Sequence, residues 1–351
     1  MNFLLQTGPG IGDLLQVLPM ASAIKSQYHD ANVDLIISSS PSRMKTAIQV
    51  MQCQNYIRNL YWYSVSYKLH SAATLLRLRM NHYDAGFIRD GGMVVNKAKP
   101  SMWIFRIMRW GGVKNIVSFV KNQVGTFVDV PDFSHYTEHD RLALKAAGIN
   151  AEMTFKTIDR DKLDFSFENY DRLKDSGNVI ALSTGTNECY WHINGRRIAY
   201  DVKSWGYEKW LELAKRLSIE GFNVVLLGGT EERRRMSAKN LAVPKNERIF
   251  DFIGKTNIKQ SLAPLSLCRL AVGAEGGMMH CAAGLGVKTL TVFGGSDSRK
   301  WTPIGGEILT LGLDCQPCFS SERAVQCQYH KCLEGISVEM VFEKVMTLMN
   351  K

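Results

Sequence analysis

A glycine-rich turn close to the N-terminus carries the first residues that could do chemistry. Gly8, Gly10 and Gly12 lead into Asp13, between an apolar stretch that predicts a strand and one that predicts a helix. Glycines let a backbone approach a ligand closely, and the N–H groups of a first helical turn attract anions. Asp13 either stabilises the start of the helix or accepts a proton from a nearby hydroxyl.

The spacing of this turn disfavours the common nucleotide-binding loops. The glycines follow G-x-G-x-G rather than G-x-G-x-x-G, and Pro9 removes one N–H donor. No acidic residue stands out at the end of a second strand, where a dinucleotide ribose would need one. The chain contains no G-x-x-x-x-G-K-[ST] sequence, which excludes a P-loop.

Three more segments of polar and glycine residues follow expected strands in the second half. They are 183–186 with Lys203 after it, 228–232, and 273–280 with His280 at its end. The carboxyl ends of parallel strands meet at one edge of a sheet, so a single ligand could contact all three. Plainer explanations also exist: a solvated lysine at a helix start, a structural histidine, and glycines that only form turns.

Cysteines fall into two groups of four. The spacing C-x2-C-x8-C-x4-C near the C-terminus is typical of metal ligands and predicts a structural zinc or iron site, with free or disulfide-bonded thiols as the alternative; it comprises Cys315, Cys318, Cys327 and Cys332. The others are expected to be buried small apolar residues in a reduced protein: Cys53, Cys189, Cys268 and Cys281.

Short β-type runs alternate with amphipathic stretches, which predicts parallel sheets flanked by helices. The expected strands are 2–6, 33–38, 83–88, 115–119, 179–183, 223–227, 248–253, 270–273 and 288–293. The expected helices are 13–26, 138–147, 207–218, 231–240 and 338–349. A charge-dense segment at 150–177 predicts a linker. We therefore expect two doubly wound Rossmann-like domains, 1–165 and 166–351, facing across a cleft, with the last helix a candidate to pack back on the first.

Membrane-spanning and secreted classes are disfavoured. The most apolar segment, 265–293, is interrupted by charged residues before it reaches the length of about 18 residues that a spanning helix needs. Ala21-Ser22-Ala23 mimics a signal-peptide cleavage site, yet no basic leader precedes it and the glycine turn and Asp13 interrupt the apolar part. We expect a cytoplasmic protein.

Taken in order, these motifs resemble glycosyltransferase family 9, the lipopolysaccharide heptosyltransferase type with a GT-B fold. The resemblance extends over nearly the whole chain, from Phe3 to about Val345, and the second half carries most of it. It implies an inverting enzyme that transfers a sugar, in most members a heptose, from a nucleotide-diphosphate donor to a hydroxyl of a lipid-linked or cell-surface saccharide. No metal ion is needed for catalysis, and the first domain binds the acceptor.

The resemblance also assigns roles to residues. Asp13 matches the family's general base. The donor site would comprise Gly10, Gly12, Thr184, Thr186, Lys203, Glu231, Glu275, Gly276, Gly277 and His280. Lys203 would reach the diphosphate and Glu231 the ribose, and the helix start at 276–280 would meet the phosphates.

The segment at 275–280 departs from the family pattern D-T-G-x-x-H. Glu275 and Gly276 replace the usual Asp and Thr, so a hydroxyl donor is missing and the identity of the sugar is open. Two alternatives therefore remain. One is an epimerase-like or phosphorylase-like enzyme acting on a nucleotide sugar, and the other is a sugar-nucleotide-binding protein that has lost catalysis.

The charge distribution fits an anionic acceptor. Lys and Arg total 43 against 33 Asp and Glu, a net charge of +10, which indicates an anionic partner. Most of the excess lies in a basic belt that alternates with aromatic residues: Lys68, Arg77, Arg79, Arg89, Lys97, Lys99, Arg106, Arg109, Lys114 and Lys121. We expect the belt to face a glycolipid acceptor and the inner-membrane surface. A solvated helix face is the alternative, and nucleic acid is disfavoured because no binding module accompanies the belt.

Overall fold

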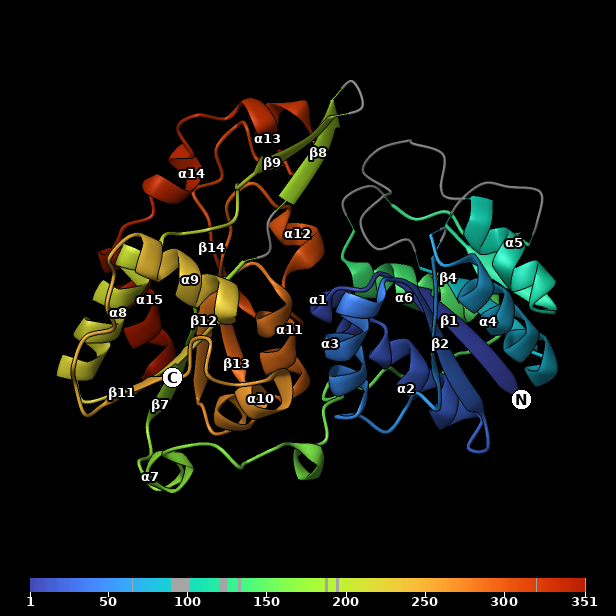
Figure 1. The fold of residues 1–351 in the computed structure, drawn as a ribbon, viewed down its shortest axis with the longest axis horizontal. Helices are drawn as coiled ribbons and strands as arrows, with labels where there is room; N and C mark the ends of the chain where they lie inside the picture. Colours follow the sequence, from blue (N-terminus) through green and yellow to red (C-terminus); the bar gives the residue numbers. More distant parts are fainter. Residues whose placement is uncertain are drawn as a thin grey trace. The chain divides into compact units, whose positions relative to one another are not determined.

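The computed structural model describes residues 1–64, 66–89, 102–119, 125–131, 134–186, 189–193, 196–319 and 321–350. The chain divides into two compact units, Met1–Lys162 and Leu163–Lys351 (Figure 1). Each unit is built on its own parallel sheet. Lys97, Lys99 and Lys121 of the basic belt lie outside the described residues.

Unit 1 contains a six-stranded parallel sheet in the order β3-β2-β1-β4-β5-β6. The strands are β1 (Asn2–Thr7), β2 (Asn32–Ser38), β3 (Leu60–Tyr63), β4 (Ala85–Ile88), β5 (Asn115–Ser118) and β6 (Thr126–Phe127). The helices are α1 (Ile11–Gln16), α2 (Leu18–Gln27), α3 (Pro41–Met51), α4 (Lys68–Asn81), α5 (Met102–Trp110) and α6 (Tyr136–Ala146). β1 is buried almost throughout because it lies inside the sheet, which explains its nearly continuous apolar sequence.

The helix expected at 13–26 is two helices, α1 and α2, which meet at Val17. Pro19 explains the break. Within one continuous helix its ring would clash with the carbonyl of Leu15, and it has no N–H to donate. At the second position of a new helix neither problem arises, and Pro19 occupies that place in α2.

Unit 2 repeats the strand order of unit 1, as β11-β10-β7-β12-β13-β14. These parallel strands are β7 (Val179–Ser183), β10 (Asn223–Leu227), β11 (Ile249–Asp251), β12 (Leu270–Ala274), β13 (Lys288–Val292) and β14 (Glu307–Leu309), and β8 (Cys189–Ile193) and β9 (Arg196–Tyr200) form an antiparallel hairpin. The helices are α7 (Tyr170–Lys174), α8 (Tyr207–Ile219), α9 (Thr230–Ala238), α10 (Ile258–Ser266), α11 (Gly277–Gly284), α12 (Ser298–Trp301), α13 (Glu322–Gln326), α14 (Lys331–Glu334) and α15 (Val338–Met349), and a 3-10 turn (Arg160–Lys162) ends unit 1.

The strand order confirms the expected fold class of two doubly wound Rossmann-like sheets. In each unit the order reverses beside the first strand, β1 or β7, and this is where such sheets bind ligands. The last helix packs its apolar side into the core of unit 2: Val341 and Val345 of α15 are buried in one cluster with Trp210 and Leu213 of α8. Among the helices that the structure describes, none has the length and apolarity needed to cross a bilayer.

Candidate functional site

Asp13 lies just beyond the carboxyl end of β1, in the first turn of α1. The N–H of Gly10 donates to its Oδ2 at 3.2 Å, which is the arrangement of a helix capping box. The turn encloses the carboxylate closely: a Cβ on Gly10 would lie 2.8 Å from Oδ2, and one on Gly8 would overlap it. The glycines of this turn therefore make room for Asp13.

Three loops of unit 2 meet at the carboxyl edge of its sheet, as the sequence predicts. The first follows β7, the second joins β10 to α9, and the third joins β12 to α11. A Cβ on Gly185 would lie 2.7 Å from the Glu232 carboxylate of the second loop, and a Cβ on Gly276 would lie 3.9 Å from the carbonyl oxygen of Gly185. The three loops are therefore in direct contact.

Lys203 and Glu275 form an ion pair at this edge. Lys203 Nζ contacts Glu275 Oε2. It also lies 4.3 Å from the centre of the ring of Phe319, which is far from Lys203 in the sequence. The Ser296 hydroxyl donates to the same Oε2 at 2.8 Å. The two side chains are only 16% and 11% exposed, and their contact joins the loop after β12 to the loop before α8.

The electrostatics of Glu275 favour its ionised form. Burial alone would raise the pKa of this carboxyl, but the charge and hydrogen bond of Lys203, the Ser296 hydroxyl and the nearby His280 together lower it below its usual value. His280 is buried in the first turns of α11. Lys203 and Glu275, with His280 beside them, therefore form one charged cluster.

The two threonines after β7 differ in their surroundings. Thr184 is buried, and both its N–H and its hydroxyl donate to the carbonyl of Leu227, at 3.0 and 3.2 Å. Its hydroxyl is thus used in a hydrogen bond that joins the end of β7 to the end of β10. Thr186 is half-buried in the loop itself, so of the two hydroxyls it is the better placed to meet a ligand.

Glu231, which was expected to reach the ribose, and its neighbour Glu232 point in different directions. Glu231 pairs with Arg234 and Arg235 on the surface of α9, and these hydrogen bonds lower its pKa to about 2. Glu232 turns inward, accepts from the N–H of Gly229 at 2.7 Å and borders Gly185. The carboxylate that faces the loops is therefore that of Glu232, which the sequence analysis did not select.

Gly276 and Gly277 begin α11 as expected. Gly276 has an extended backbone, with φ of 177°, and the nearest atom to a Cβ built on it is 3.8 Å away. A side chain would therefore fit at residue 276. Gly10 and Gly12, also predicted to bind the donor, belong to α1 and its start in unit 1.

The predicted metal site is not supported. Among the described residues, no group of three or more His, Cys, Asp or Glu side chains is arranged to hold a metal ion. Cys332 is buried in the main core of unit 2 and Cys318 packs against Val202, while Cys315 is exposed. Burial and the neighbouring thiols of Cys332, Cys315 and Cys327 raise the pKa of Cys318 to about 11. All four are free cysteines; Cys53, Cys268 and Cys281 are buried, as expected, and the side chain of Cys189 lies outside the described residues.

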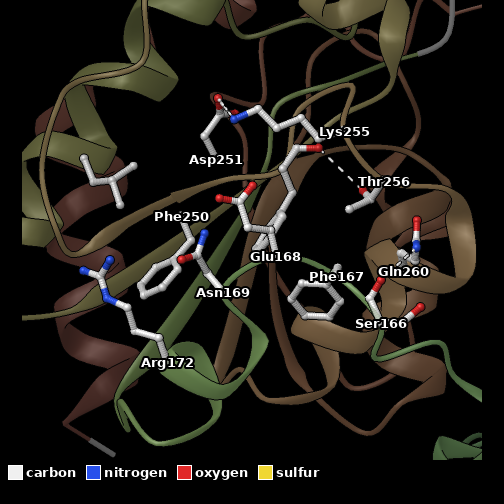
Figure 2. A pocket seen from close by; sticks show the side chains of 12 residues that line it. Ser166, Phe167, Glu168, Asn169, Arg172, Phe250, Asp251, Lys255, Thr256 and Gln260 are labelled. Carbon is white, nitrogen blue, oxygen red and sulfur yellow. Dashed lines mark hydrogen bonds and ion pairs between the residues drawn. The ribbon is translucent and has the colours of Figure 1, made fainter.

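A cavity of about 420 Å³ lies on another part of unit 2, between α7, β11 and α10 (Figure 2). Phe167 and Phe250 line it together with Glu168 and Arg172, and Lys255 pairs with Asp251 at its rim, 3.1 Å apart. None of the residues predicted from the sequence lines it. It was missed because five of its twelve lining residues belong to the segment interpreted as a linker.

Two further partners of the charged cluster were also missed. Ser296 follows the carboxyl end of β13, so the edge rule applied to that strand would have found it. Phe319 lies in an irregular loop with no periodic pattern, and its contact with Lys203 carries no signal in the sequence.

Comparison with known proteins agrees with the resemblance seen in the motifs. Residues 190–329 match the model of glycosyltransferase family 9 (heptosyltransferase). The chain is 24% identical over 153 residues to lipooligosaccharide heptosyltransferase 2 of Haemophilus influenzae, which covers 43% of this chain and 44% of that protein. The match therefore spans less than half the length of this curated relative.

Solved structures match over the whole chain. The ADP-heptose LPS heptosyltransferase II of Escherichia coli has a TM-score of 0.68 and 15% identity, covering 100% of this chain and 99% of that one. The E. coli heptosyltransferase WaaC with ADP has the same TM-score and identity, covering 99% and 100%. At this identity the likeness shows a shared fold, which is the predicted GT-B architecture of two Rossmann-like domains.

Proposed function

From the match of residues 190–329 to the heptosyltransferase family and the fold shared along the whole chain, we propose that this protein is an inverting glycosyltransferase. It would move a sugar, with a heptose as the first candidate, from a nucleotide-diphosphate donor to a hydroxyl of a lipid-linked saccharide. The observation that carries the proposal is the ion pair of Lys203 and Glu275, with His280 beside it, at the carboxyl edge of the sheet in unit 2.

The donor would bind at that edge by its diphosphate. Lys203 supplies a point charge for the phosphates, and α11, which begins just after Glu275, offers the N–H groups of its first turn. Thr186 offers a hydroxyl, and Glu232 a carboxylate that can accept from a ribose hydroxyl. An adenine nucleotide is the first choice of donor, because the similar structures carry ADP or are named for ADP-heptose.

The transfer would proceed as a single displacement. The acceptor oxygen forms a bond to the anomeric carbon while the bond from that carbon to the diphosphate oxygen breaks, and the electron pair leaves with the diphosphate. Asp13 takes the proton of the acceptor hydroxyl. Lys203 and the start of α11 stabilise the charge that develops on the leaving diphosphate. Unit 1 would bind the acceptor, and unit 2 the donor.

Thermal unfolding in the presence of ADP, GDP, UDP and CDP tests this proposal. A ligand that binds only the folded protein raises Tm, by about 5 °C or more at a large excess over its Kd. We expect ADP to give the largest shift and Lys203→Ala to abolish it, with Lys215→Ala on the exposed side of α8 as the matched control. No shift with any diphosphate, or equal shifts in both lysine variants, would contradict the assignment.

A further inference from the structure

Helix α4 of unit 1 presents a stripe of large apolar side chains to solvent. Leu69, Leu76 and Met80 are 90%, 67% and 79% exposed. Their spacing of seven and then four residues places all three on one line along the helix. The opposite side of α4 is the one that packs, since Thr74 and Leu78 are buried. The exposed stripe therefore makes no contribution to the core.

Helix α5 has an outward face of the same character. Trp103 and Trp110 are 48% and 52% exposed, and Arg106 and Arg109 lie on the same side of the helix. The Arg106 guanidinium lies 5.5 Å from the centre of the Trp103 ring. Tryptophan and arginine together are the residues that anchor proteins at a membrane–water interface.

The two faces belong to one surface. Leu78 of α4 and Ile104, Phe105 and Met108 of α5 are buried in the same core cluster, so both helices pack on the same side of the sheet. A Cβ on Gly111, just after α5, would lie 3.1 Å from Cβ of Leu78. Figure 1 shows α4 and α5 next to each other in unit 1. Since their buried sides share a core, their exposed sides face outward together.

The charge on this α4–α5 face has a single sign. Neither helix contains an Asp or Glu, and five cations flank the apolar side chains: Lys68, Arg77, Arg79, Arg106 and Arg109. Within the part of the chain that the structure describes, none of the five forms an ion pair. On α4 the helical spacing puts Arg77 on one flank of the stripe and Arg79 on the other.

We propose that the α4–α5 face docks on the surface of a lipid bilayer that contains anionic lipids. The leucine, methionine and tryptophan side chains enter the headgroup region, and the cations meet the lipid phosphates. Nucleic acid would satisfy the cations but leave the aliphatic stripe in water. A second copy of this face, packed symmetrically, would place like charges against each other. The inference goes beyond the proposed glycosyl transfer and does not depend on it.

Co-sedimentation of the full chain with vesicles tests the proposal. Vesicles of phosphatidylcholine alone are compared with vesicles of equal parts phosphatidylcholine and phosphatidylglycerol, at low and high salt. We expect binding to the anionic vesicles that weakens with salt. Arg77→Gln with Arg79→Gln should reduce it about fivefold for each cation removed. Leu76→Ser with Met80→Ser should reduce it by about tenfold or more.

The matched control combines Lys215→Gln with Ile219→Ser, an exposed cation and an exposed apolar residue on α8 of unit 2. It should bind vesicles like the unchanged protein. Equal binding to both kinds of vesicle, or equal effects of the control and the α4 variants, would overturn the proposal. So would RNA binding without vesicle binding, or a serine variant that only converts a dimer to a monomer.

Discussion

At the scale of single residues, Lys203 shares its charge with a carboxylate. Glu275 and the Phe319 ring hold its ammonium in place, and Ser296 holds Glu275. A lysine fixed in this way loses little side-chain freedom when it meets a phosphate. A diphosphate must, however, compete with Glu275 for the same ammonium, so this acidic residue sets how strongly the site attracts anions.

Because the pKa of Glu275 is lowered in the folded protein, its ion pair should make the stability of the fold depend on pH in the acid range. Because the folded-state pKa lies below the unfolded value of about 4.3, the pair stabilises the fold above that pH and the stability is lost as pH falls through the folded pKa. In Glu275→Gln the free energy of unfolding should therefore fall less between neutral pH and pH 3 than in the unchanged protein. Urea unfolding measures this difference, and the exposed Glu212→Gln is a control that should show the same fall as the unchanged protein.

Residue 276 offers a test of the missing hydroxyl. The extended backbone and the 3.8 Å clearance allow a side chain, so Gly276→Thr should fold normally. If the start of α11 binds the diphosphate, the added hydroxyl should tighten ADP binding by about twofold to tenfold, the value of one hydrogen bond. Gly276→Val has the same shape without the hydroxyl, and calorimetry that gives equal affinities for the two variants would reject this role.

The sequence predicted which residues lie near the sheet edge, but not which side chains they contact there. Position after an expected strand was enough to select Glu275 and His280, because sheet topology brings such positions together, whereas Lys203 was selected before a helix and through the family resemblance. It could not separate Glu231 from Glu232, because their orientations depend on which one caps α9. The predicted metal site is not supported among the described residues, and cysteine spacing does not reveal that Cys332 is buried in the core.

At the scale of elements, a buried ion pair fastens α6 to the end of β4. Arg89 Nε donates to Asp140 Oδ1 at 2.6 Å, and both side chains are buried. Asp140→Ala leaves the arginine charge unpaired and should cost about 3–5 kcal/mol of unfolding free energy at pH 7. The pair of changes Arg89→Met and Asp140→Leu should restore most of it in denaturant unfolding. A double variant as unstable as the single one would contradict this account.

The sequence predicted those helices and strands whose burial produces either a periodic pattern of apolar residues or an unbroken apolar run. β7, β10 and α15 have the expected bounds because they form the core of unit 2. The short edge strand β3 and helix α4 were not predicted. Apolar side chains cover both sides of α4, one in the core and one in solvent, so its sequence lacks the periodicity of a helix with one buried side.

At the scale of the whole molecule, the two units have the same strand order. In each unit the polar loops follow strands and lie at the carboxyl edge of a parallel sheet. This regular order of strand, polar loop and helix is why the sequence could predict the fold class. Asp13 belongs to unit 1, and the charged cluster to unit 2. The account therefore requires that proton transfer and donor binding be separable by mutation.

Sugar transfer and ADP binding by Asp13→Asn test this requirement most directly, with the exposed Asp30→Asn as the control. Loss of a general base should lower the rate of transfer by about a hundredfold to ten-thousandfold while calorimetry gives an unchanged Kd for ADP. Asp30→Asn should leave both unchanged. Transfer at the full rate by Asp13→Asn, or a loss of ADP binding as large as the loss of transfer, would contradict the account.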